Sequence, residues 1–209
     1  MITALAVWLL PAAGCAAPSS PPAPATPTAP PWQALYDGWV WPAPIPDFAL
    51  IDQAGRAFHL SDLEGYLLVG FIFTRCQVGE ACPLTTTKMA RTLDLWTAAA
   101  APPPLHLLSL TLDPETDTPE RLRAYAEARG LDLRRWTLAT GPRALMADKL
   151  PSLFNVLALP SEEGGITHTV KVALLRPDRT QVAEWKDDAF QPQAALDALL
   201  ADASAPRGE

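Results

Sequence analysis

The sequence has few basic residues and no cluster of them. Its 209 residues contain 16 lysines and arginines against 23 aspartates and glutamates, which gives a formal net charge of −7. Without a run of Lys or Arg, neither a phosphate backbone nor an anionic membrane surface finds an electrostatic partner on this chain. The composition therefore argues against nucleic-acid binding and favours proteins or a metal ion as partners.

Cysteine is also scarce. The chain has three, Cys15, Cys76 and Cys82. Five residues separate Cys76 from Cys82, which is too wide for the redox motif with two residues between its cysteines. Two sulfurs at this spacing can still meet, either in a disulfide or as two ligands of one metal ion. The spacing alone leaves both interpretations open.

No hydrophobic run near the N-terminus is long enough to span a bilayer. Residues 1–14 are apolar and end in small residues before Cys15, and they are too short for a membrane-spanning helix. Ala12-Ala13-Gly14-Cys15 resembles a bacterial lipobox, so we interpret 1–14 as a lipoprotein signal peptide and Cys15 as the lipidated residue. An apolar leader with an incidental cysteine is the alternative.

A linker and one domain are expected after Cys15. The rest of residues 15–43 is rich in Pro and Ala up to residue 31, a composition that favours an extended chain over a packed core. We assign residues 44–205 to a single globular domain, which fits its length.

The longest buried-strand pattern leads directly to the cysteine pair. Leu67–Phe73 is an uncharged run rich in β-branched and aromatic residues, which is typical of a central parallel strand covered on both faces. Pro83 has a fixed φ suited to the first turn of a helix, so we expect a helix from Cys82 to Ala98. A helix N-terminus stabilises negative charge and thus favours the thiolate of Cys82, which is both a nucleophile and a soft metal ligand.

The remaining pattern predicts an α/β fold: a thioredoxin-like sandwich with an added N-terminal β-hairpin. The expected elements are a hairpin at 48–51 and 56–60, a strand at 105–112, a helix at 119–129 capped by Thr118, a short strand at 136–139, a helix from about 142 to 149, a hairpin at 169–175 and 180–185, and a helix at 192–203.

His168 stands just before the first strand of the last hairpin. In a thioredoxin-like sheet the start of that strand lies beside the loop between the cysteines. A lone histidine is more often an ordinary surface or core residue, but two cysteines across the same cleft favour a ligand. Two thiolates and one imidazole suit Cu(I), which accepts three ligands, whereas structural zinc requires a fourth that the sequence does not offer. We assign no role to His59 or His106.

Several motifs occur in an order that resembles the SCO/SenC family. They are Pro46-Asp47-Phe48, Leu60-Ser61-Asp62-Leu63-Glu64-Gly65, Phe71-Ile72-Phe73-Thr74-Arg75-Cys76, Cys82-Pro83, Leu112-Asp113-Pro114-Glu115 with Asp117-Thr118-Pro119, Trp136-Thr137-Leu138, and His168. The resemblance implies a membrane-attached copper protein that assists assembly of the binuclear copper centre of cytochrome c oxidase. It also implies that Cys76, Cys82 and His168 hold copper, as Cu(I) or Cu(II), and that Asp113 supports the site. Members usually have three residues between the cysteines, and this chain has five.

The function we expect is that of a copper metallochaperone in the bacterial cell envelope, anchored by lipid and facing the periplasm or extracytoplasmic side. Its partner would be the copper-bearing oxidase subunit or another periplasmic copper carrier. A membrane-anchored thiol-disulfide oxidoreductase using Cys76 and Cys82 is one alternative. Such enzymes normally place a proline just before the facing strand, where this chain has Thr167-His168. A copper or redox sensor, and a structural disulfide between Cys76 and Cys82, also remain open.

Overall fold

The computed structural model describes residues 44–75, 81–160 and 166–206. The strands are β1 (Ala49–Asp52), β2 (Ala57–His59), β3 (Tyr66–Ile72), β4 (Leu105–Thr111), β5 (Trp136–Thr140), β6 (Ala158–Pro160), β7 (Ile166–His168), β8 (Lys171–Leu175) and β9 (Gln181–Lys186). The helical segments are η1 (Leu60–Asp62), α2 (Ala81–Ala98), α3 (Pro119–Ala128), η2 (Ala144–Lys149), α4 (Leu150–Leu153), η3 (Asp187–Ala189) and α5 (Pro192–Ser204).

A seven-stranded sheet in the order β2-β1-β5-β4-β3-β8-β9 forms the middle of the domain, and β6 and β7 form a separate two-stranded sheet. Strand β3 lies inside this sheet, next to its middle strand β4, and pairs in parallel with β4 and antiparallel with β8. All seven of its residues are buried, which explains the uncharged run in the sequence. Because β3, β4 and β5 are parallel, the loops that follow them emerge at one edge of the sheet.

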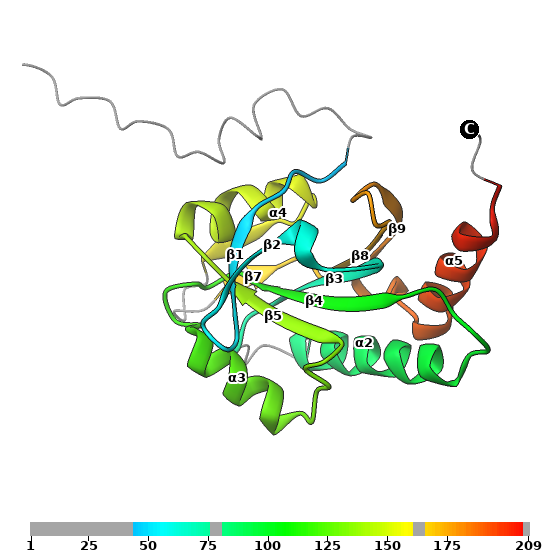
Figure 1. Cartoon of the computed structure of the whole chain (residues 1–209). Coiled ribbons are helices and arrows are strands. Elements are labelled where there is room, and N and C mark those ends of the chain that lie inside the picture. Colours follow the sequence, from blue (N-terminus) through cyan, green and yellow to red (C-terminus); the bar gives the residue numbers. More distant parts are fainter. Residues whose placement is uncertain (1–43, 76–80, 161–165, 207–209) are drawn as a thin grey trace, which may run out of the picture.

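Helices cover both faces of this sheet, which confirms the expected α/β sandwich. Helices α2, α3 and α5 pack on one face, and η2 with α4 packs on the other (Figure 1). Successive side chains of β3 alternate between the two cores, with Leu67 in one and Leu68 in the other. At Gly70 a Cβ atom would lie 2.7 Å from the sulfur of Met89, so glycine permits the close approach of α2 to β3.

The antiparallel strands β1 and β2 form one edge of the main sheet. Strand β1 pairs with β2, with Ala49 opposite His59, and also pairs antiparallel with β5. Gly55 lies in the connecting turn with φ of +78°, a conformation that glycine adopts without steric cost. The pair therefore belongs to the main sheet.

Two helical segments show how local chemistry sets the elements. As expected, Thr118 caps α3, because its hydroxyl accepts a hydrogen bond from the Arg121 amide at 3.4 Å and Pro119 follows it. The helix expected at 142–149 is instead a π-helix, η2, continued by the short α4. Pro151 has no amide hydrogen, so a regular α-helix here would lack the bond from residue 151 to the carbonyl of residue 147.

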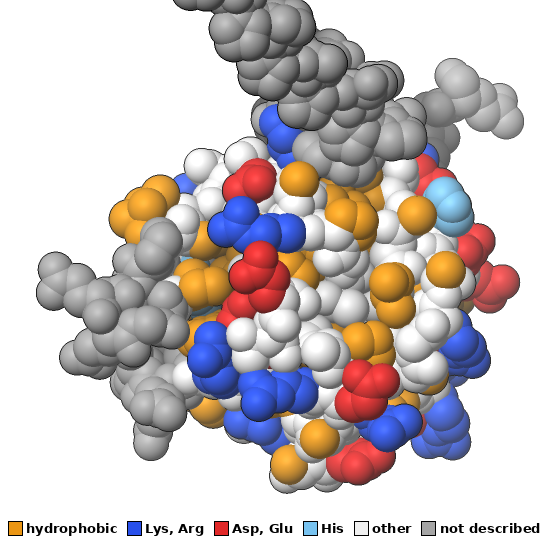
Figure 2. All heavy atoms as spheres, turned by 90° about the vertical axis from the view of Figure 1, so that its left-hand side faces the viewer, with side chains coloured by type: hydrophobic (Ala, Val, Ile, Leu, Met, Phe, Trp, Pro, Cys, Tyr) orange, Lys and Arg blue, Asp and Glu red, His pale blue; other side chains and the backbone are white. Residues whose placement is uncertain are grey.

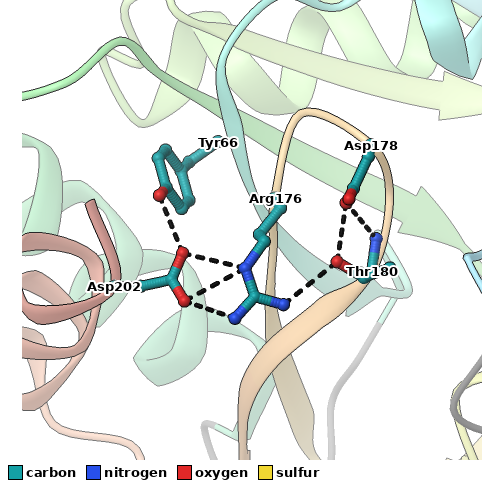
Figure 3. A network of polar contacts seen from close by, with 5 residues as sticks. All are labelled: Tyr66, Arg176, Asp178, Thr180 and Asp202. Carbon is teal, nitrogen blue, oxygen red and sulfur yellow. Dashed lines mark hydrogen bonds and ion pairs between the residues drawn. The ribbon is translucent and has the colours of Figure 1, made fainter. Parts of the chain in front are cut away.

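A polar network ties α5 to the sheet at the end where β3 begins (Figure 3). The Tyr66 hydroxyl donates to Asp202 at 2.8 Å, and the Arg176 guanidinium forms a bidentate ion pair with the same carboxylate through two of its nitrogens. Arg176 also donates to the Thr180 hydroxyl at 3.1 Å. The network therefore lies at the opposite end of β3 from the loop that leads to Cys76.

Candidate functional site

The residues predicted as copper ligands fall only partly within the described structure. Cys76 and Cys15 lie outside the described residues, as do the segments 1–14 and 15–43. Helix α2 begins at Ala81, one residue before the expected start, so Cys82 is its second residue. The side chain of Cys82 lies outside the described part of the structure. His168 is described, and so are Thr74 and Arg75, which lead from β3 into the cysteine loop.

A buried carboxylate holds the chain just before Cys76. The Asp117 side chain accepts hydrogen bonds from the Thr74 amide at 3.2 Å, from the Thr74 hydroxyl, and from the Thr111 hydroxyl at 2.5 Å. Both Thr111 and Asp117 have no solvent exposure. We call these three residues, Thr74, Thr111 and Asp117, the Asp117 clamp. It fixes the end of β3 to the end of β4 two residues before Cys76.

The clamp also changes the acidity of its carboxyl group. Burial raises the pKa of Asp117, because a charged carboxylate is disfavoured away from water, and the nearby Asp113 acts in the same direction. The hydrogen bonds from Thr111 and Thr74 oppose that effect. Asp117 was not predicted from the sequence. The sequence singled it out only as part of the Asp117-Thr118-Pro119 motif and as an acidic residue just before a helix cap, and neither pattern shows that the side chain turns inward.

Asp113, predicted to support the site, lies at the same edge. Its amide donates to the Thr111 hydroxyl at 3.0 Å, so it follows directly from the clamp. Its carboxylate pairs with the Arg75 guanidinium at 3.0 Å and is 14% exposed. The Arg75 guanidinium also lies 5.6 Å from the centre of the Phe73 ring. Asp113 therefore anchors the residue that immediately precedes Cys76.

His168 occupies a different element from the one expected. It is the last residue of β7 and pairs with Ala158 of β6, whereas the sequence placed it in a loop before the last hairpin. The first strand of that hairpin, β8, begins at Lys171 and runs antiparallel to β3, with Gly70 opposite Val172. The start of β8 therefore lies beside the end of β3 from which the cysteine loop departs, and His168 comes three residues earlier in the chain.

The imidazole of His168 is suited to binding a metal ion. Its Nδ1 lies 3.1 Å from the Thr169 carbonyl oxygen, which favours the tautomer with the proton on Nδ1 and the lone pair on Nε2. Burial lowers the pKa of His168, although the Thr169 contact opposes this, so the neutral ring predominates at neutral pH. The neutral ring is the form that coordinates metals.

The other two histidines lie on β4 and β2, away from the proposed copper site. His106 lies in β4, where its Nε2 is 2.8 Å from the Thr137 hydroxyl, and burial together with Arg135 lowers its pKa to about 4. His59 is exposed and lies 3.4 Å from Asp47. Within the described side chains, no group of three or more His, Cys, Asp or Glu residues is arranged to hold a metal ion. Neither cysteine of the predicted site is among those side chains.

In the described part of the chain, no helix combines the length and the apolar character needed to cross a membrane.

Sequence comparison identifies relatives over most of this domain. Residues 42–202 match the model of the SCO1/SenC family. The SCO1 protein homolog of Bacillus subtilis is 28% identical over 138 residues, which cover 64% of this chain and 69% of the relative. The mitochondrial SCO2 homolog of Homo sapiens is 29% identical over 136 residues, and the chain spans only 50% of that protein.

Solved structures share the fold. A SCO1/SenC family lipoprotein from Bacillus anthracis matches with a TM-score of 0.67 and 22% identity, covering 77% of this chain and 96% of that one. Bradyrhizobium japonicum ScoI, solved with copper bound, matches with a TM-score of 0.60 and 25% identity, covering 75% and 98% of the two chains. The family match extends from before β1 into α5 and includes the clamp, Asp113 and His168. This chain belongs to the SCO1/SenC family.

Proposed function

We propose that this protein binds copper through Cys76, Cys82 and His168 and transfers it to the binuclear copper centre of cytochrome c oxidase. One observation supports the proposal: His168 comes three residues before β8, and the start of β8 pairs with the part of β3 that leads to Thr74 and Cys76. Membership in the SCO1/SenC family, with copper bound in the Bradyrhizobium relative, supports the metal.

The chemistry of the three side chains fits this cargo. Cu(I) is a soft ion that prefers thiolate ligands, and imidazole is also a good copper ligand. The helix N-terminus at Cys82 favours its thiolate, and the low pKa of His168 favours a neutral ring. A thiolate and a neutral imidazole are the forms of these side chains that bind copper. Oxidation of the two cysteines to a disulfide would remove both sulfur ligands, so copper binding would require the reduced pair.

We further propose that the domain works at a membrane surface. Lipid on Cys15 would anchor the chain, and residues 16–43 would let the domain reach its partner in the periplasm or on the extracytoplasmic side. The Cys15→Ser variant should then leave the membrane fraction or remain unprocessed. If it partitions into membranes like the parent protein, Cys15 does not carry the anchor.

The decisive experiment compares copper ligation with thiol exchange. The reduced protein is titrated anaerobically with Cu(I) against a competing chelator, and X-ray absorption reports sulfur and nitrogen neighbours of the bound ion. His168→Ala should weaken Cu(I) binding by at least about 10- to 100-fold, the loss typical of changes that affect ligands only indirectly. The variant should still cycle between dithiol and disulfide. His59→Ala, which removes an exposed histidine, is the matched control.

The same variant separates the proposal from the oxidoreductase alternative in cells. A metallochaperone lacking His168 should fail to support oxidase assembly at limiting copper, whereas a thiol reductase should not need the imidazole. If His168→Ala supports normal assembly while Cys76→Ser does not, the reductase becomes the better description.

A further inference from the structure

A groove opens at the same edge of the sheet as the proposed copper site. It lies between the loop after β4, the η2 helix and the β6–β7 hairpin, and its volume is about 280 Å³. Leu112, Ala158 and Ile166 supply apolar surface, whereas Asp113, Glu115, Asp148 and Arg143 supply charge, so we call it the acidic groove. Pockets for drug-sized ligands measure about 300–1,000 Å³, so this groove fits one or two side chains better than a cofactor.

The charged groups of this acidic groove can change partners at little cost. Glu115 pairs with Arg143 at 3.2 Å, but their side chains are 72% and 67% exposed. Ion pairs as exposed as this one contribute little to stability, so an incoming cation can replace Arg143. The Asp148 carboxylate has no ion pair or hydrogen bond to any residue that the structure describes. The groove therefore presents two carboxylates to a positively charged group.

The groove continues into exposed hydrophobic surface beside the histidine. Leu159, which also lines the groove, is 53% exposed, and its neighbour Leu157 is 59% exposed. Between them, Ala158 pairs directly with His168 across the β6–β7 hairpin. Figure 2 faces this edge and shows hydrophobic side chains interspersed with acidic and basic ones. A protein bound in the groove would thus reach the hairpin that carries His168.

We infer that the acidic groove docks the protein that accepts copper from this chain, through an apolar side chain flanked by Lys or Arg. This inference rests on the proposed function, because direct exchange requires a partner that brings its own copper ligands to the site. The apolar side chain fills the groove against Leu112 and Leu159, and the cation pairs with Glu115 and Asp148. Complementary charges of this kind mainly accelerate association and fix orientation.

The test measures copper transfer separately from copper binding. The copper-loaded protein is mixed with the soluble copper-bearing domain of the same organism's cytochrome c oxidase, and transfer is followed by stopped-flow spectroscopy at several salt concentrations. The Glu115→Lys, Asp148→Lys double variant should slow transfer about 10-fold or more at low salt, with a smaller difference at high salt. Leu159→Ser should slow transfer at all salt concentrations.

A control variant and a separate measurement of Cu(I) affinity distinguish failure of the docking inference from failure of the proposed function. Glu127→Lys is the matched control, because Glu127 is 67% exposed, pairs with Arg123 and does not line the groove. Chelator competition should give the same Cu(I) affinity for every variant, since none changes a proposed ligand. If the parent transfers copper and the double variant does so equally fast at low salt, the docking inference is overturned and the proposed function stands. If the parent itself binds no copper, both are overturned.

Discussion

Replacing Asp117 with Asn tests whether the Asp117 clamp supports the cysteine loop. The carboxylate accepts three hydrogen bonds from Thr74 and Thr111 in a site with no solvent exposure. Asn keeps one accepting oxygen and replaces the other with an NH₂ group that donates. Because a buried donor left without an acceptor costs about 1–3 kcal/mol, we expect the free energy of unfolding to fall by that order.

The loss should depend on pH in a definite direction. An unfolded aspartate has a pKa of about 3.9, and burial raises the pKa of Asp117 in the folded protein. Between those two values the folded state binds more protons than the unfolded state, so stability falls as pH rises from about 4 through the folded pKa. Asn cannot titrate. The stability difference between parent and Asp117→Asn should therefore shrink as pH rises.

Urea denaturation between pH 4 and pH 7.5 measures this difference, and Cu(I) competition measures the consequence for the site. Because Thr74 lies two residues before Cys76, we expect Asp117→Asn to weaken Cu(I) binding about 10- to 100-fold, the range typical of groups that orient ligands. Asp94→Asn, which changes an exposed aspartate on α2, is the control. A stability difference that grows with pH would refute the raised pKa, and an unchanged Cu(I) affinity would refute the positioning role.

Three further predictions concern the body of the domain. Gly70→Ala places a Cβ 2.7 Å from the Met89 sulfur, so it should cost about 1–3 kcal/mol in urea denaturation, and a second change, Met89→Val, should recover part of that loss. His106 should titrate by NMR with a pKa of about 4, and stability should fall as pH drops from about 6.5 toward 4. His106→Gln should lack that decline, and a ring pKa near 6.5 would contradict the prediction. Arg176→Met removes the cation beside the Asp202 carboxylate, and because Arg176 is 34% exposed the cost in thermal denaturation should be about 1.5–3 kcal/mol rather than that of a fully buried pair. The Cu(I) affinity of Arg176→Met should not change, and a change would show that the two ends of β3 are coupled.

The fold was predictable because its strongest signals are local. The uncharged run at Leu67–Phe73 predicted β3 to within one residue, since a strand buried on both faces contains few polar side chains. Thr118 and Pro119 predicted the start of α3 because a hydroxyl cap and a proline act within one turn of the chain.

The site was less predictable because it depends on contacts distant in sequence. Asp117 bonds to Thr74, which lies 43 residues earlier, and no local pattern reports that contact. His168 was identified as a candidate, but its pairing with Ala158 in a separate sheet was missed because strands of three residues leave little periodic signal. The predicted assembly of Cys76, Cys82 and His168 remains a prediction.

The two polar anchors of β3 have a consequence for how the site can adjust. Asp202 holds the Tyr66 end of the strand, and Asp117 holds the chain just beyond its other end. Between them β3 is hydrogen-bonded on both sides, whereas β6 and β7 pair only with each other in the described structure. Strand β3 is thus held rigidly at both ends. If His168 binds copper as proposed, binding and release should displace β7 more than β3, and amide hydrogen exchange should be faster in β7 than in β3.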